Sequence, residues 1–147
     1  MYARIKQTLY VTALVLGTAV SVAAQTVEDG VLTASDGYNQ AHFGADISVL
    51  GDRALIGSSN GSPVGSAYVF ERDASGTWIE VATLHPTTGD MNGGFGSSLS
   101  LHGDRALIGS WADSDLGFNF GSAHLYERDA GGNWQELVEL VGSDINY

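Results

Sequence analysis

Residues 43–58 read FGADISVLGDRALIGS and residues 95–110 read FGSSLSLHGDRALIGS, so one stretch of sequence occurs twice at an offset of 52. Of the 16 aligned pairs, 11 are identical. Similarity at a fixed period is the sequence signature of repeat architectures. The chain is therefore expected to fold as a repeat protein.

A second pair of blocks follows in the same order. Residues 65–74 (GSAYVFERDA) match residues 121–130 (GSAHLYERDA) at an offset of 56, which continues to Trp78 and its counterpart. The second copy thus has 56 − 52 = 4 additional residues, which lie between residues 110 and 121. A change of length between two matched blocks marks a surface loop.

Each copy predicts four short strands. Gly51-Asp52 is a two-residue hairpin turn, and the run Ala54-Leu55-Ile56 is apolar on both faces, which indicates a buried strand. No stretch after residue 24 shows a sustained 3.6-residue period. Four antiparallel strands in a unit of about 50 residues are typical of a propeller blade. The predicted strands are 45–50, 53–58, 66–72 and 77–84, then 97–102, 105–110, 122–128 and 133–140.

The sequence therefore predicts an all-β fold, a partial β-propeller with two four-stranded antiparallel blades at about 43–84 and 95–140. An extra N-terminal outer strand is expected at 25–32, which aligns with 77–84 at an offset of 52. Propellers typically have 4–8 blades, so two blades are part of a ring. Two interpretations stay open: a truncated structural fragment of a larger propeller protein, or a protein that self-associates to complete a propeller.

Residues 1–24 have the three parts of a secretory signal peptide. A basic start precedes an uncharged run at 9–22, and small residues follow up to Gln25, the expected mature N-terminus. The run is short for a membrane span of about 20 residues. We expect cleavage, no stable membrane insertion afterwards, and a propeller domain at 25–147 that is secreted, periplasmic or at the cell surface.

The composition is acidic, with 17 Asp and Glu against 6 Lys and Arg. Cleavage would remove Arg4 and Lys6, which gives a mature net charge of 4 − 17 = −13. Such a surface repels the phosphates of nucleic acids and anionic lipids, so neither is an expected partner. The chain has no Cys, which excludes a disulfide framework and a thiol nucleophile.

The order of these blocks resembles FG-GAP repeats of the short bacterial type, which are related to the propeller of integrin α chains. The resemblance rests on Phe-Gly, Gly-Asp-Arg-Ala-Leu-Ile-Gly-Ser, Gly-Ser-Ala, Trp and a closing Leu, and it covers about residues 25–147. It implies an extracellular β-propeller used for cell adhesion or ligand binding, without catalysis. Kelch repeats are the nearest competing resemblance, and they also predict a propeller.

Calcium is a possible cofactor at one place. Integrin-type repeats carry a loop of alternating Asp residues after the Phe-Gly, but here that interval holds only tight Gly-Asp turns, so that calcium site does not carry over. Asp113, Asp115 and Asn119 in the extended loop of the second unit offer alternating oxygen donors around a glycine, which resembles half of a calcium loop. The competing interpretation is a solvated loop that uses these residues for turns.

Three aromatic residues, Trp111, Phe118 and Phe120, flank the same loop. Exposed aromatic rings at the rim of a propeller stack on sugars or grip a partner protein, so an extracellular protein or a glycan is the expected ligand. The competing interpretation is that these rings fill the gap between blades.

The sequence favours an exported, non-catalytic binding or adhesion module over an enzyme. Residues 57–61 (GSSNG) match a hydrolase elbow, but that motif needs a following helix, and none is predicted. Part of a secreted hydrolase remains the enzymatic alternative. Arg53 and Arg105 follow the Gly-Asp turn in both copies, which indicates a structural role in each blade, such as pairing with a carboxylate.

Overall fold

The computed structural model describes residues 3–9, 25–36, 41–60, 65–88, 93–113 and 120–143. All regular structure in these ranges is β-strand. No helix of this part of the chain is long and apolar enough to cross a bilayer.

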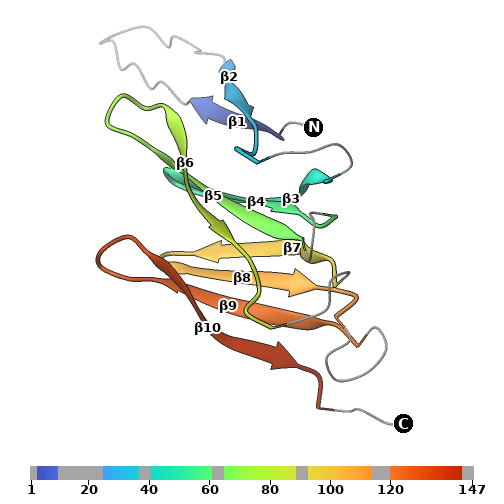
Figure 1. The fold of residues 1–147 in the computed structure, drawn as a ribbon. Coiled ribbons are helices and arrows are strands. Elements are labelled where there is room, and N and C mark those ends of the chain that lie inside the picture. The colour runs from blue at the N-terminus through green and yellow to red at the C-terminus, as the bar shows by residue number, and fades with distance from the viewer. Residues whose placement is uncertain are drawn as a thin grey trace, which may run out of the picture.

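Two four-stranded antiparallel sheets lie one above the other (Figure 1). Each sheet follows the chain order from one edge strand to the other, so the first is β3-β4-β5-β6 and the second is β7-β8-β9-β10. The strands of the first are β3 (Phe43–Leu50), β4 (Arg53–Ser58), β5 (Ser66–Arg72) and β6 (Trp78–Leu84). Those of the second are β7 (Phe95–His102), β8 (Arg105–Ser110), β9 (Ser122–Arg128) and β10 (Trp134–Val141).

These strands confirm the predicted all-β fold and the two predicted blades. The arrangement is that of a partial β-propeller, and the described residues do not close a ring. The predicted outer strand is also present as β2 (Gln25–Leu32), which pairs antiparallel with β1 (Ala3–Leu9). Cleavage of residues 1–24 stays a prediction, and residues 10–24 lie outside the described part of the chain.

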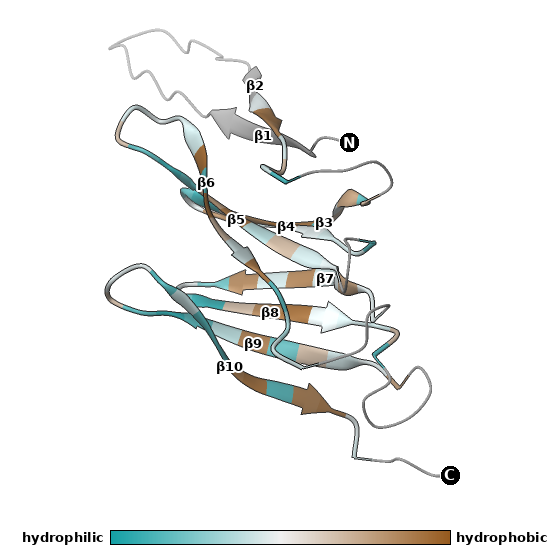
Figure 2. Ribbon diagram, in the orientation of Figure 1, coloured by the Kyte–Doolittle hydropathy of each residue, from teal (hydrophilic) through white to brown (hydrophobic). Residues whose placement is uncertain are grey.

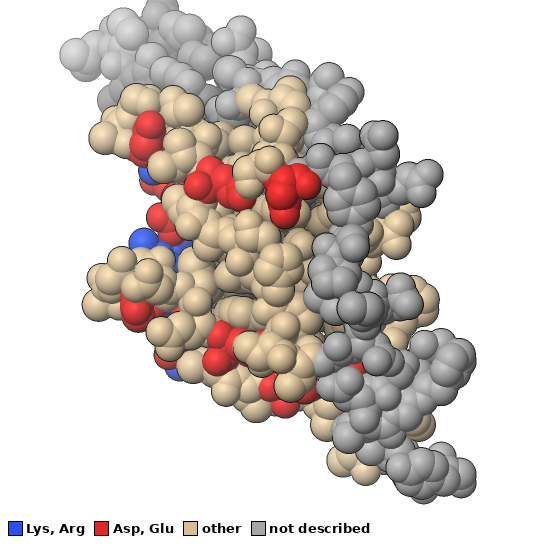
Figure 3. Space-filling view, in the orientation of Figure 1, with Lys and Arg blue, Asp and Glu red and all other residues tan. Residues whose placement is uncertain are grey.

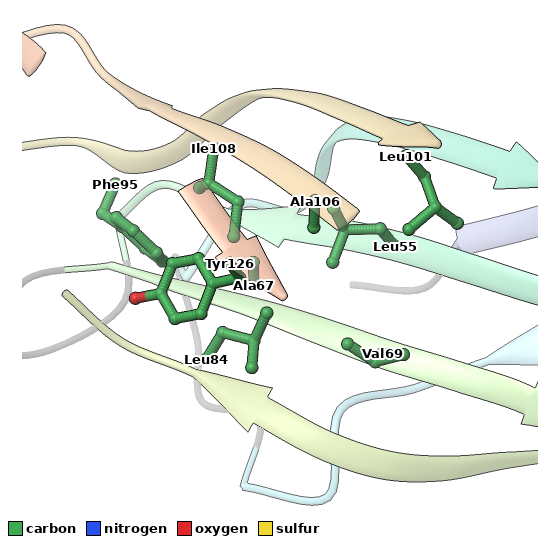
Figure 4. Close-up of a cluster of buried hydrophobic side chains, with 9 residues drawn as sticks. All are labelled: Leu55, Ala67, Val69, Leu84, Phe95, Leu101, Ala106, Ile108 and Tyr126. Carbon is green, nitrogen blue, oxygen red and sulfur yellow. The ribbon is translucent and has the colours of Figure 1, made fainter. Parts of the chain in front are cut away.

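An apolar core fills the space between the two sheets (Figure 4). The first sheet contributes aliphatic side chains from one of its faces, and the second contributes aromatic and aliphatic ones, because alternate residues of a strand point to the same face. The members are Leu55, Ala67, Val69 and Leu84 from the first sheet and Phe95, Leu101, Ala106, Ile108 and Tyr126 from the second.

A second cluster on the other face of the first sheet repeats this core in register. Phe43, Ala54 and Ile56 stand where Phe95, Ala106 and Ile108 stand one repeat later, and Leu32 stands where Leu84 does; Tyr68 and Phe70 complete the cluster. Equivalent residues therefore occupy equivalent places in both units, which explains why the sequence blocks match.

Glycines let the sheets approach closely at one end. A Cβ on Gly57 or on Gly65 would overlap a backbone carbonyl oxygen of the Phe95-Gly96 pair, and Gly65 forms an isolated bridge with Phe95. Gly96 in turn has a φ of 86°, which favours glycine. We call Gly57, Ser58, Gly65 and Ser66, on which the Phe-Gly pair rests, the Phe-Gly seat of the first sheet.

Polar contacts join the sheets along β3 and β7, which we call the inner strands, as β6 and β10 are the outer strands. The amide of Leu99 donates to Asp46 Oδ2 at 2.6 Å, and the amide of Leu101 donates to Ser48 Oγ at 3.0 Å. These bonds satisfy amides at the edge strand β7 that would otherwise lack a partner in the ladder.

The second sheet has an open face, turned away from the first sheet. Leu107 is 39% exposed on it, although its counterpart Leu55 is fully buried, and Leu140 is 48% exposed where Leu84 is 4% exposed. Hydrophobic residues colour much of β10 in Figure 2. Nothing in the described part of the chain covers this face as the second sheet covers the first.

Candidate functional site

A hollow of about 360 Å³ lies on the open face, at the end of the second sheet where the extended loop begins and ends. Its lining combines small residues with two aromatic rings. It consists of Ser97, Ser98, Gly109, Ser110, Trp111, Phe120, Gly121, Ser122, Ala123, Leu140 and Gly142.

The hollow corresponds in the repeat to the Phe-Gly seat. Its Gly109, Ser110, Gly121 and Ser122 align with the four residues of the seat in the first sheet. There Phe95 and Gly96 fill the space; on the second sheet the equivalent surface faces solvent. The hollow thus has the same glycine and serine lining as the Phe-Gly seat, with no Phe-Gly pair of the described residues on it.

The two described aromatic residues of the predicted ligand site lie at this hollow. Trp111 is 67% exposed and Phe120 is 50% exposed. The indole of Trp111 lies close over Gly94, where any Cβ would overlap it, so the ring has support on one side and solvent on the other. Phe118, the third predicted residue, lies outside the described residues.

A buried polar cluster lies behind the hollow. Ser122 Oγ donates to Asp113 Oδ2 at 2.6 Å and is 2.9 Å from His124 Nε2, while His124 Nδ1 is 2.7 Å from Glu136 Oε1. His124 is fully buried and Asp113 is 3% exposed. The Thr87 amide, from the linker between the sheets, donates to Glu136 at 2.8 Å.

These hydrogen bonds control the ionisation of Glu136. Burial alone would raise its pKa, but the bonds from His124 and from Thr87 outweigh burial and hold the pKa below its usual value. The carboxylate is therefore ionised and aligned on Nδ1 of the imidazole.

The cluster has the order of a Ser–His–acid hydrolase triad, but the hydroxyl of its serine points elsewhere. A triad serine gives its proton to the imidazole. Here the Ser122 hydroxyl donates to the Asp113 carboxylate instead, and a carboxylate has no proton to return. The Ser122 hydroxyl proton thus points to a carboxylate and not to Nε2 of the imidazole, although Nε2 is only 2.9 Å away.

The residues of the predicted calcium loop are only partly described. Asp113 lies in the buried cluster, with its backbone oxygen accepting the amide of Gly121 at 3.0 Å, which closes the base of the loop. Asp115 and Asn119 lie outside the described residues, so calcium binding by the three residues stays a prediction.

A second hollow, of about 320 Å³, lies at the hairpin end between the sheets and is lined by charged residues such as Arg53, Glu71 and Asp104. Arg53 Nε bonds Glu71 at 2.7 Å and its Nη1 bonds the Gly103 oxygen at 2.7 Å. Arg105 and Glu127 repeat the first bond at 3.0 Å, which confirms the predicted carboxylate pairing in each blade.

The surface of the molecule is acidic, and carboxylates outnumber basic groups on the face in Figure 3.

The chain has two stacked four-stranded antiparallel sheets, and the outer strand of the first leads into the inner strand of the second. This arrangement, with the Phe-Gly contact between the sheets, defines a repeat protein of the propeller-blade class. The family model for the FG-GAP repeat matches residues 26–70 and 78–126, and the chain belongs to this family. No match was found among curated proteins. Each matched unit begins with an outer strand, β2 or β6, and continues through three strands of the following sheet.

Sequence reasoning missed the grouping of His124 with Asp113, Ser122 and Glu136, because a single histidine on a strand is not distinctive. A comparison of the two units could have identified this cluster from the sequence. His124 replaces Tyr68 at the same position of the repeat, and Ser122 and His124, two residues apart on one strand, point to the same face.

Proposed function

We propose that this chain is an exported, non-catalytic binding module of the adhesion type, which holds an extracellular glycan or protein at the hollow between Trp111 and Phe120. The single observation that carries the proposal is the exposure of Trp111, 67%, on the rim of the hollow. Ser59 occupies the same position in the first unit, so a large aromatic residue is not needed for the fold.

The surroundings suit such a contact. An aromatic ring with one supported and one solvated face stacks on a sugar or packs against an apolar side chain at small entropic cost. The acidic surface disfavours nucleic acid and anionic membranes as alternatives.

A glycan and matrix-protein array, run with and without calcium, tests the proposal. The decisive variant is Trp111→Ser, which installs the residue of the first unit. We expect W111S to lose binding with an unchanged melting temperature, and Leu137→Ser, at a 50% exposed residue of β10 that does not line the hollow, to keep it. A large loss of melting temperature in W111S would show that the ring serves packing, and would overturn the proposal.

A second candidate function has its own observation, the equivalence of the hollow and the Phe-Gly seat. In this alternative the chain is a structural unit, and its open face takes another blade by self-association. Light scattering on the mature chain, with Leu107→Asp as the disrupting variant, separates the two: W111S acts on ligand binding, whereas L107D acts on assembly.

A further inference from the structure

We propose that the second blade binds one divalent transition-metal ion of the zinc class through Asp113, His124 and Glu139. None of these three residues lines the hollow beside Trp111, and the inference does not rest on the proposed function. It also differs from the predicted calcium loop, since it shares only Asp113 with that set.

The donor atoms have the spacing of a metal site. One carboxylate oxygen from Asp113, one from Glu139 and one ring nitrogen of His124 all lie within 4.8 Å of one another. His124 Nε2 and Asp113 Oδ2 are 3.8 Å apart. Donors bound at about 2.0–2.1 Å on a tetrahedral ion lie about 3.4 Å apart, so a small adjustment brings the two atoms into coordination.

Charge and burial favour a cation here. Glu139 Oε2 accepts the Thr88 hydroxyl at 2.7 Å, but its Oε1 is buried and has no hydrogen-bond partner among the described residues. Three carboxylates, those of Asp113, Glu136 and Glu139, surround one imidazole. Carboxylates in such surroundings are stabilised by a nearby cation, and a buried acceptor without a partner is costly.

The second layer of the site is already in place. Glu136 Oε1, 2.7 Å from His124 Nδ1, fixes the orientation of the ring and leaves Nε2 facing Asp113. A carboxylate on the far nitrogen of a ligating histidine is the usual support of zinc sites. Ser122 Oγ lies 2.6 Å from Asp113 Oδ2 and 2.9 Å from Nε2, and an ion bound to these two atoms would replace both contacts.

Comparison with the first unit shows which residues of this cluster occur in both units and which occur in the second unit alone. Glu80 accepts the Ser35 amide at 2.9 Å, just as Glu136 accepts the Thr87 amide, so this glutamate has a structural role in both units. In contrast, Tyr68 and Thr83 occupy the positions of His124 and Glu139. Two of the three proposed ligands are thus absent from the first unit, although its fold is the same. The mixed nitrogen and oxygen donor set favours zinc-class ions over calcium.

The test is titration of the chelator-treated chain, purified without a histidine tag, with Zn²⁺ against a chromogenic competitor. We expect one ion per chain, a higher melting temperature with Zn²⁺, and, with Co²⁺ as the probe, visible absorption of a tetrahedral site. Glu139→Thr and His124→Tyr install the residues of the first unit, and each should weaken Zn²⁺ binding at least about tenfold. His102→Leu, which also installs the residue of the first unit, removes an exposed histidine and should bind as the parent does.

Three results would overturn the proposal. They are no stoichiometric binding, equal affinity in E139T and the parent chain, and stabilisation by Ca²⁺ but not by Zn²⁺. E139T keeps the test decisive if H124Y does not fold, because Glu139 is only partly buried whereas His124 is fully buried.

Discussion

Leu55 and Leu107 occupy the same position in the two units, yet one is fully buried between the sheets and the other is 39% exposed on the open face. Truncation of each to alanine therefore compares one side chain in two environments. We expect Leu55→Ala to cost about 2–5 kcal/mol of unfolding free energy, because the cavity opens inside the core of Figure 4. Leu107→Ala should cost about 1 kcal/mol or less.

Urea unfolding, followed by tryptophan fluorescence and by circular dichroism, measures both costs. With a slope of about 1–3 kcal/mol per molar urea, the L55A midpoint should fall by about 0.7 M or more. The L107A midpoint should stay close to that of the parent chain. Equal costs for the two variants would refute the reasoning, because Leu107 would then be as fully covered in solution as Leu55 is.

Three further predictions use single residues. Gly65→Ala should destabilise more than Gly51→Ala, by urea unfolding, because both glycines have positive φ but only Gly65 meets a backbone carbonyl oxygen of the second sheet; the Gly51 change alone costs about 1–2 kcal/mol. Burial and the bond to Asp36 raise the pKa of Tyr68 to about 12, so its phenolate should form near that pH in an absorbance titration; the neutral phenol stabilises the fold below about pH 10, and this contribution is lost as the pH rises through 12. The bond from Ser75, with backbone amides, lowers the pKa of Asp73, so Asp73→Asn should lower stability near neutral pH, and this difference should vanish as the pH falls through the lowered pKa.

Most of the fold could be predicted because the repeat fixes the strands. The Gly51-Asp52 turn and the apolar run after it marked β3 and β4, and β4 begins and ends as predicted. The inner strands were predicted two residues too short, since β3 begins at Phe43 and β7 at Phe95. Each Phe-Gly pair is the first part of its strand.

The candidate site was harder to predict from the sequence than the fold, because it depends on contacts between segments that are distant in the chain. Trp111 and Phe120 were identified from their place beside the extended loop, and the structure brings them to one hollow. The polar cluster joins the loop, β9 and β10 with a linker that precedes them. The pairing of β2 with β1 was not predicted, since residues 3–9 were assigned to the signal peptide.

The four extra residues of the second unit leave the ladder beside them unchanged. Gly109 pairs with Ala123 as Gly57 pairs with Ala67, so the longer connection does not shift β9 along β8. The length of the loop between β8 and β9 can therefore change without a change in the pairing of the sheet. Successive repeats can thus acquire different loops at this end of the sheet, by insertion as well as by substitution, while their four-stranded sheets keep the same structure.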